Sequence, residues 1–153
     1  MATLSVTHTE SIILNGEEFG GTNTISFAGI GEISKRIFTI TTAESVIATF
    51  SSAVASAGHY VAADVRYIRF TNRDGTNFIT LTFRNHDNDE VAIKLDAGQS
   101  FVWNADNSGG MVDVFNATQD ADAASDTALG DLTNIQADAN TGSCDLEMFI
   151  ASV

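Results

Sequence analysis

The run Cys144-Asp145-Leu146-Glu147-Met148-Phe149-Ile150 decides the fold class of this chain. Apolar and polar side chains alternate along it, and a side chain that repeats every second residue points to the same face of a β-strand. The same alternation begins near the other end, at Leu4-Ser5-Val6-Thr7, and returns along most of the chain between. The pattern therefore predicts half-buried antiparallel sheet, and no catalytic motif is laid over it.

Most of the expected strands are rich in Val, Ile, Thr and Phe, which favours sheet. They span residues 2–14, 33–42, 45–50, 65–71, 78–84, 90–95, 100–103, 111–115 and 143–153. The dipeptide Asn15-Gly16 suits a tight turn after the first strand. We expect loops at residues 17–32, with a small strand at 25–27, and at residues 51–62. A competing interpretation exists for residues 44–57, where apolar side chains also recur at helical spacing.

The clearest hairpin signal joins residues 65–71 to residues 78–84 through a polar loop, in which Gly75 supplies the positive φ that such loops need. Two further strands follow after short loops, so four strands in succession predict a meander. Many short strands with closely spaced turns indicate an all-β, single-domain antiparallel β-sandwich or jelly-roll-like fold. Residues 1–153 should form this one domain, with the acidic Asp/Ala-rich segment 118–131 as a loop.

Length and cysteine content indicate a domain that is held together by its core. A chain of 153 residues buries roughly 70% of its unfolded surface when it folds. The single cysteine, Cys144, reads as a small buried hydrophobe rather than a reactive thiol. Residues 1–6 lack the features of a signal peptide, and the uncharged stretch 45–63 is a poor membrane span. We therefore expect folding in a cytoplasm and no membrane partner.

The charge is strongly acidic and unevenly placed. The formal net charge is −13, and residues 95–153 carry ten acidic residues with no Lys or Arg. Such a surface repels phosphate backbones, so we expect no nucleic-acid partner. Solubility at high local concentration is the simplest explanation of the acidic excess.

No arrangement of residues predicts catalysis, a metal site or a cofactor site. His8, His59 and His86 lie far apart in sequence and form no metal-binding pair. No nucleophile elbow supports a Ser-His-Asp triad. The acidic clusters 87–90 and 120–126 lack the spacing of a calcium loop, and solvated carboxylates explain them. We therefore expect a protein that is not an enzyme.

Candidate partner contacts come from basic and aromatic side chains. Arg66 and Arg69 lie on opposite faces of their strand, so we expect at least one to pair with a carboxylate across a strand or an interface. Arg73 and Arg84 are the other basic candidates. Trp103, flanked by Phe101, should anchor the core or a subunit contact.

Three stretches resemble small β-rich virion structural proteins of tailed bacteriophages, especially marine ones. They are Asp64-Val65-Arg66-Tyr67-Ile68-Arg69-Phe70-Thr71-Asn72, Leu95-Asp96-Ala97-Gly98-Gln99-Ser100-Phe101 and the opening Ala2-Thr3-Leu4-Ser5-Val6-Thr7-His8-Thr9-Glu10. The resemblance covers about the first 105 residues. The Asp-rich segment 118–131 has no counterpart in it.

The resemblance implies a non-enzymatic part of a virion that is assembled in the host cytoplasm. Its implied role is a capsid decoration (cement) protein that binds the major capsid protein or other virion proteins, and a trimer is the expected homo-oligomer. A tail, fibre or neck accessory protein is the alternative within the same setting. A carbohydrate-binding β module, with Trp103 as a stacking face, is the alternative from another class.

Overall fold

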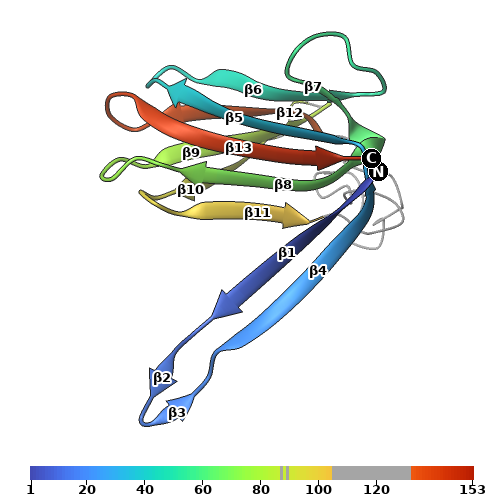
Figure 1. Cartoon of the computed structure of the whole chain (residues 1–153). Helices are drawn as coiled ribbons and strands as arrows, with labels where there is room; N and C mark the ends of the chain where they lie inside the picture. Colours follow the sequence, from blue (N-terminus) through green and yellow to red (C-terminus); the bar gives the residue numbers. More distant parts are fainter. Residues whose placement is uncertain (87, 89, 105–131) are drawn as a thin grey trace.

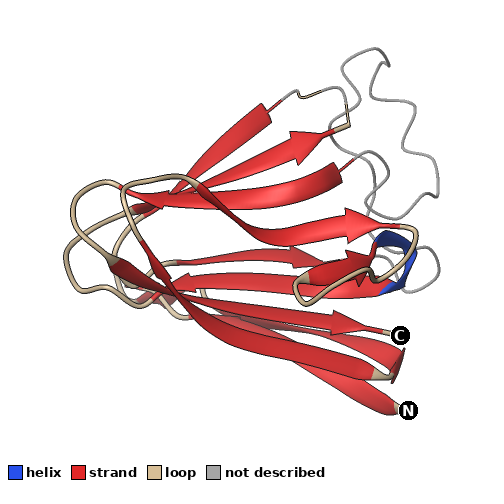
Figure 2. Ribbon diagram, turned by 90° about the horizontal axis from the view of Figure 1, so that it is seen from above, coloured by secondary structure: helices blue, strands red, loops and turns tan. Residues whose placement is uncertain are grey.

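The computed structural model describes residues 1–86, 88, 90–104 and 132–153, which form two packed β-sheets and a projecting hairpin (Figure 1). Viewed from above, the two sheets form separate layers (Figure 2). The five-stranded sheet has the order β10 (Glu90–Leu95), β9 (Ile79–Asn85), β12 (Leu132–Ala139), β6 (Ser45–Ser51) and β7 (His59–Val61). The four-stranded sheet has the order β11 (Ser100–Asn104), β8 (Val65–Asn72), β13 (Cys144–Ser152) and β5 (Glu32–Ile40). The all-β sandwich predicted from the alternation is confirmed.

The hairpin, here called the arm (residues 2–30), is predicted by the sequence only in its first half. β1 (Ala2–Glu10) pairs antiparallel with β4 (Gly21–Ile30), and beyond them β2 (Ile13–Leu14) pairs with β3 (Glu17–Glu18). The turn at Asn15-Gly16 is confirmed by the positive φ of both residues. The small strand expected at 25–27 is confirmed, but the loop expected around it at 17–32 is wrong, because β4 is a ten-residue strand. Its run of Gly, Asn and Thr becomes a strand because every residue from 21 to 27 has a partner in β1.

The expected hairpin and meander are also wrong, although the strands exist, and Gly75 does not have the positive φ expected of it. β8 pairs with β11 and β13, whereas β9 pairs with β10 and β12 in the other sheet. The loop after β8 therefore carries the chain from one layer to the other, and the connection from β10 to β11 brings it back. Both faces that meet between the layers are apolar, so crossing buries them against each other.

The remaining elements divide between confirmed strands and missed ones. β6 is a strand, which decides against the helical interpretation of residues 44–57, and β13 matches the expected final strand. β12 and the short β7 are not among the expected strands, and β7 pairs parallel to β6. A 3-10 turn (Ala62–Asp64) follows β7. The strand expected at 111–115 and the acidic loop expected at 118–131 lie outside the described residues.

The core lies between the two sheets and is lined by aliphatic and aromatic side chains from both. Phe70 of β8 and Phe83 of β9 are fully buried and meet edge to face, with ring centroids 6.5 Å apart. Trp103 is partly buried and packs against Phe83 with centroids 5.6 Å apart, so part of its side chain belongs to the core. Cys144 is buried, as expected, and burial raises the pKa of its thiol, with the Asp74 and Asp145 carboxylates acting in the same direction.

Candidate functional site

The base of the arm packs on the outer face of the four-stranded sheet, which is the side turned away from the core. Phe27 and Ile30 of β4 form a second buried cluster with Tyr67 of β8 and Ala151 of β13. Phe27 is 1% exposed, although it belongs to a strand that projects from the body. Gly29, with φ at 78°, accommodates the irregular register where β4 joins the body. This contact fixes the direction in which the arm leaves the sandwich.

An open groove of about 400 Å³ lies between the arm and this outer face. The arm lines it with residues of β1, including Val6 and His8, and the sheet with Tyr67, Arg69 and Phe149. Burial raises the pKa of the Tyr67 hydroxyl, while nearby Arg69 opposes that rise. The Arg69 guanidinium lies 5.8 Å from the centre of the Phe149 ring. The groove wall is therefore aromatic with one cation.

Beside the groove, one buried carboxylate holds three cations. The Glu147 side chain on β13 is 7% exposed and accepts a hydrogen bond of 2.5 Å from Arg69 Nη2 and one of 3.0 Å from Arg73 Nη1. Lys35 Nζ lies 3.6 Å from Glu147 Oε2, the oxygen that Arg73 also contacts. The three cations are from one third to more than half exposed, so they neutralise Glu147 while still facing solvent. The four groups together carry a net charge of +2 and are here called the cationic cluster.

An apolar stripe runs along β5 next to the cationic cluster. Ile33 and Ile37 lie opposite Ala151 and Glu147 in the antiparallel register, so they share the outer face with Lys35 between them. Ile33 is 56% exposed and Ile37 is 59% exposed. Because β5 is an edge strand of its sheet, this stripe (Ile33, Lys35, Ile37) is open to a partner.

The far end of the arm, here called the tip (residues 11–20), is also apolar and exposed. Its four large apolar side chains, Ile12, Ile13, Leu14 and Phe19, are between 55% and 70% exposed. The Phe19 amide donates to the Ile12 carbonyl at 2.9 Å, and Leu14 lies opposite Glu17. One face of the tip therefore presents Ile12, Leu14 and Phe19 with a single carboxylate, Glu17. Full burial of each such apolar side chain stabilises a contact by roughly 1.5–3 kcal/mol.

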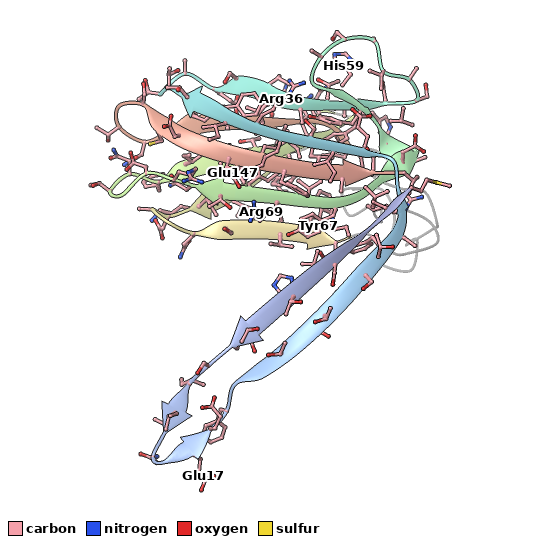
Figure 3. All side chains as sticks on the ribbon, in the orientation of Figure 1. Glu17, Arg36, His59, Tyr67, Arg69 and Glu147 are labelled. Atoms are coloured by element: carbon pink, nitrogen blue, oxygen red, sulfur yellow. The ribbon has the colours of Figure 1, made fainter. Side chains whose placement is uncertain are left out.

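The positions of the side chains are visible together in Figure 3. Glu17 lies at the far end of the arm, well away from Tyr67, Arg69 and Glu147 on the sheet (Figure 3). The tip therefore does not cover the cationic cluster of its own chain.

The predicted partner residues do not form one surface. Arg69 is paired with a carboxylate across the strand, as expected for at least one of the first two arginines, and Arg73 joins it. Arg66 instead donates to the backbone carbonyls of Ala63 and Val65. Arg84 lies on the five-stranded sheet, where it pairs with Glu90 directly opposite on β10. Only Arg69 and Arg73 are therefore brought together at the candidate site.

Neither Glu147 nor the apolar tip is identified from the sequence as part of the candidate site. In the sequence Glu147 is only one polar position in an alternating strand, and nothing nearby signals that three cations converge on it. The tip does carry a signal, because Ile12-Ile13-Leu14 stands next to the Asn15-Gly16 turn, where a solvent-exposed hairpin end is usually polar.

Among the described residues no group of three or more His, Cys, Asp or Glu is arranged to hold a metal ion. In the same part of the chain, no helix is long and apolar enough to cross a membrane. The acidic clusters considered as calcium ligands, 87–90 and 120–126, lie largely outside the described residues. Comparison of the chain with protein-family models, curated proteins and solved structures finds no match.

Proposed function

We propose that this chain is a non-enzymatic structural protein of a tailed-bacteriophage virion, and that it decorates the capsid as a homo-oligomer. The observation that carries the proposal is the arm, which leaves the sandwich and ends in four exposed apolar side chains. A protein that acts alone gains nothing from such a tip, since exposed apolar surface favours association. A protein that is used in many neighbouring copies gains a contact from every arm.

The resemblance of the first 105 residues or so to small virion proteins supports the same proposal. Within that setting the head is favoured, because a compact acidic module stays soluble at the concentrations that repetitive docking requires. A trimer is the proposed oligomer, with the major capsid protein as the partner beneath it. Tail, fibre or neck accessory proteins share the same properties, and copy number in the virion distinguishes them from a capsid decoration protein.

The placement of Trp103 makes a carbohydrate-binding module the weaker proposal. In that class an exposed aromatic ring stacks on sugar, and the ring of Trp103 instead packs against Phe83 and the core. A glycan array that gave binding above background would reverse this order of preference.

Copy number in purified virions tests the proposal. Quantitative mass spectrometry and cryo-electron microscopy of particles that contain the chain should give copies on the order of hundreds, arranged by the symmetry of the head. A dozen or fewer copies would move the protein to the neck or tail. Particles that lack the chain altogether would remove the virion proposal.

An incorporation assay sharpens this test. A variant in which Asn-Gly replaces the tip, joining Glu10 to Gly21, should fold and yet load poorly onto undecorated heads. Val46→Ser, which changes an exposed residue of the five-stranded sheet, is the matched control and should load normally. Equal loading of both variants would show that the arm has no part in decoration.

A further inference from the structure

We propose that the tip of one copy docks on the outer face of the four-stranded sheet of a second copy, over the stripe formed by Ile33, Lys35 and Ile37. This inference rests on the proposed function only in assuming that copies lie side by side. The tip of one copy and the stripe of the other are the two surfaces that join neighbouring copies.

The two surfaces carry side chains of complementary chemistry. The tip presents apolar side chains, Ile12, Leu14 and Phe19, beside the carboxylate of Glu17. The stripe presents two exposed isoleucines with a cation between them. Docking therefore buries apolar surface on both sides and places a carboxylate beside an ammonium group.

Charge points to the same pairing. Residues 1–31 contain three glutamates, Glu10, Glu17 and Glu18, and no Lys or Arg. The cationic cluster carries a net charge of +2 in a protein whose net charge is −13. Most surfaces of two such acidic copies repel each other. The acidic arm of one copy should therefore bind the other copy where cations are in local excess.

The length and the direction of the arm explain why the partner is a second copy. The base is fixed by Phe27 in the buried cluster, and the arm then continues from Thr7 to Leu14. Eight extended residues span about 26 Å at about 3.3 Å per residue. At the end of this span, the tip lies away from the cluster of its own chain (Figures 1 and 3).

The tip also needs a partner for its own order. β2 and β3 each contain two residues, and within the described part of the chain they pair only with each other. At the junction of the tip with β1 and β4, Glu18 Oε1 accepts hydrogen bonds from the amides of Ile12 and Gly20 at 3.3 and 2.9 Å, and these bonds add no apolar contact. An isolated two-stranded hairpin is marginal in water, whereas one laid on a sheet is stabilised.

Disulfide trapping tests the contact directly. The variant Leu14→Cys/Ile37→Cys places one thiol on the tip and one on the stripe, while the native Cys144 is buried and does not interfere. Under mild oxidation of the full-length protein we expect covalent dimers and higher oligomers on non-reducing gels. Mass spectrometry should find the disulfide between the thiol introduced at position 14 of one copy and the thiol introduced at position 37 of another.

Two matched controls make the trapping result specific. Leu14→Cys/Val46→Cys moves the second thiol to a residue of similar exposure, 55%, on the other sheet. Leu14→Cys alone reports tip-to-tip contact. Both should give at least tenfold less covalent oligomer. Equal trapping in any control, a link within one chain, or no trapping in Leu14→Cys/Ile37→Cys would overturn the proposal.

A charge exchange gives a second, independent readout. Glu17→Lys and Lys35→Glu should each shift sedimentation toward monomer by at least tenfold in dissociation constant. The double variant Glu17→Lys/Lys35→Glu should recover most of the loss, because the pair is restored between copies. Failure of the double variant to recover, with all three variants folded by circular dichroism, would contradict the docking.

The two proposals fail separately. Hundreds of copies on the head without trapping would leave the decoration function intact and remove the arm contact. Efficient trapping in a protein that is absent from virions would keep the contact between copies and remove the decoration function.

Discussion

The arm and the sandwich share the same alternating sequence pattern, but their apolar side chains differ in burial. In the sandwich, two apolar faces lie against each other, and side chains such as Phe70 and Ile68 are completely buried. In the arm only the base is covered, by Tyr67 and the strands beside it, whereas the tip keeps its apolar side chains in solvent. The sandwich is thus complete within one chain, and the arm is not. Alternation therefore predicts a strand but not the surface that will cover its apolar face.

The largest expected effect is the difference in unfolding free energy between two Phe→Ala variants, one in the sandwich and one in the arm. Phe70→Ala removes a fully buried ring that contacts Phe83, and should lower the free energy of unfolding by about 3–5 kcal/mol. Phe19→Ala removes a ring that is 65% exposed at the tip, and should change it by less than about 0.5 kcal/mol. Urea unfolding of monomeric protein measures both. Similar losses would mean that the tip is part of the folded core.

The next effect concerns the boundary between the two regions. Phe27→Ala opens the buried cluster at the base of the arm and should lower the local stability of the arm by about 3 kcal/mol. Hydrogen exchange should then speed up in β1 and β4 while amides of β13 stay protected. Thr24→Ala, which removes only the exposed contact with the Thr7 hydroxyl at 3.0 Å, is the control. Equal loss of protection in β13 would show that the arm and the sandwich unfold together.

A smaller effect is expected in the cationic cluster. Glu147→Ala leaves Arg69, Arg73 and Lys35 without their shared carboxylate. Because those cations are partly exposed, the loss should be about 1–2 kcal/mol rather than that of a fully buried pair. Glu90→Ala, at the more exposed pair with Arg84, should cost less than about 1 kcal/mol. The urea midpoints of the two variants test this order, and a greater loss for Glu90→Ala would contradict it.

The smallest effect lies at the end of the sandwich opposite the base of the arm, in the loop after β8 (Figure 1). The amides of Asn77 and Thr76 donate to Asp74 and lower the pKa of its carboxyl group. A lowered pKa in the folded state stabilises the protein above the unfolded value of about 3.9, and this contribution is lost as pH falls through the lower folded pKa. Asp74→Ala should therefore lower the melting temperature slightly at pH 7.

The same variant should differ little from the parent once the pH is well below the pKa of the folded carboxyl group. Thermal melts across the acid range provide the measurement. A difference in melting temperature that stays constant from neutral to acid pH would show that the charge of Asp74 is not involved. Arm protection in hydrogen exchange should be unchanged at every pH, since the loop lies at the opposite end of the sandwich from the base of the arm.

Several elements were predictable from local pattern alone, while others were not. β5, β6, β8 and β13 follow from period-2 alternation and β-branched side chains. β12 alternates as well, but two of its three alternating apolar side chains are alanines, so its pattern is weak. The strands on either side, β6 and β9, complete its backbone pairing. β4 was missed for the same reason, since its Gly and Asn residues disfavour strand until β1 lies beside them. Local propensity weighs little against a full set of paired backbone groups.

The sequence by itself determined that this chain is all-β, that Asn15-Gly16 is a turn and that Cys144 is buried, because each depends on residues close together in the chain. Only the tertiary structure decided that the strands before and after Gly75 belong to different sheets. It also decided that Glu147 gathers Lys35, Arg69 and Arg73. These outcomes depend on contacts across many residues of separation, where burial of two whole faces sets the pairing and no short pattern records it.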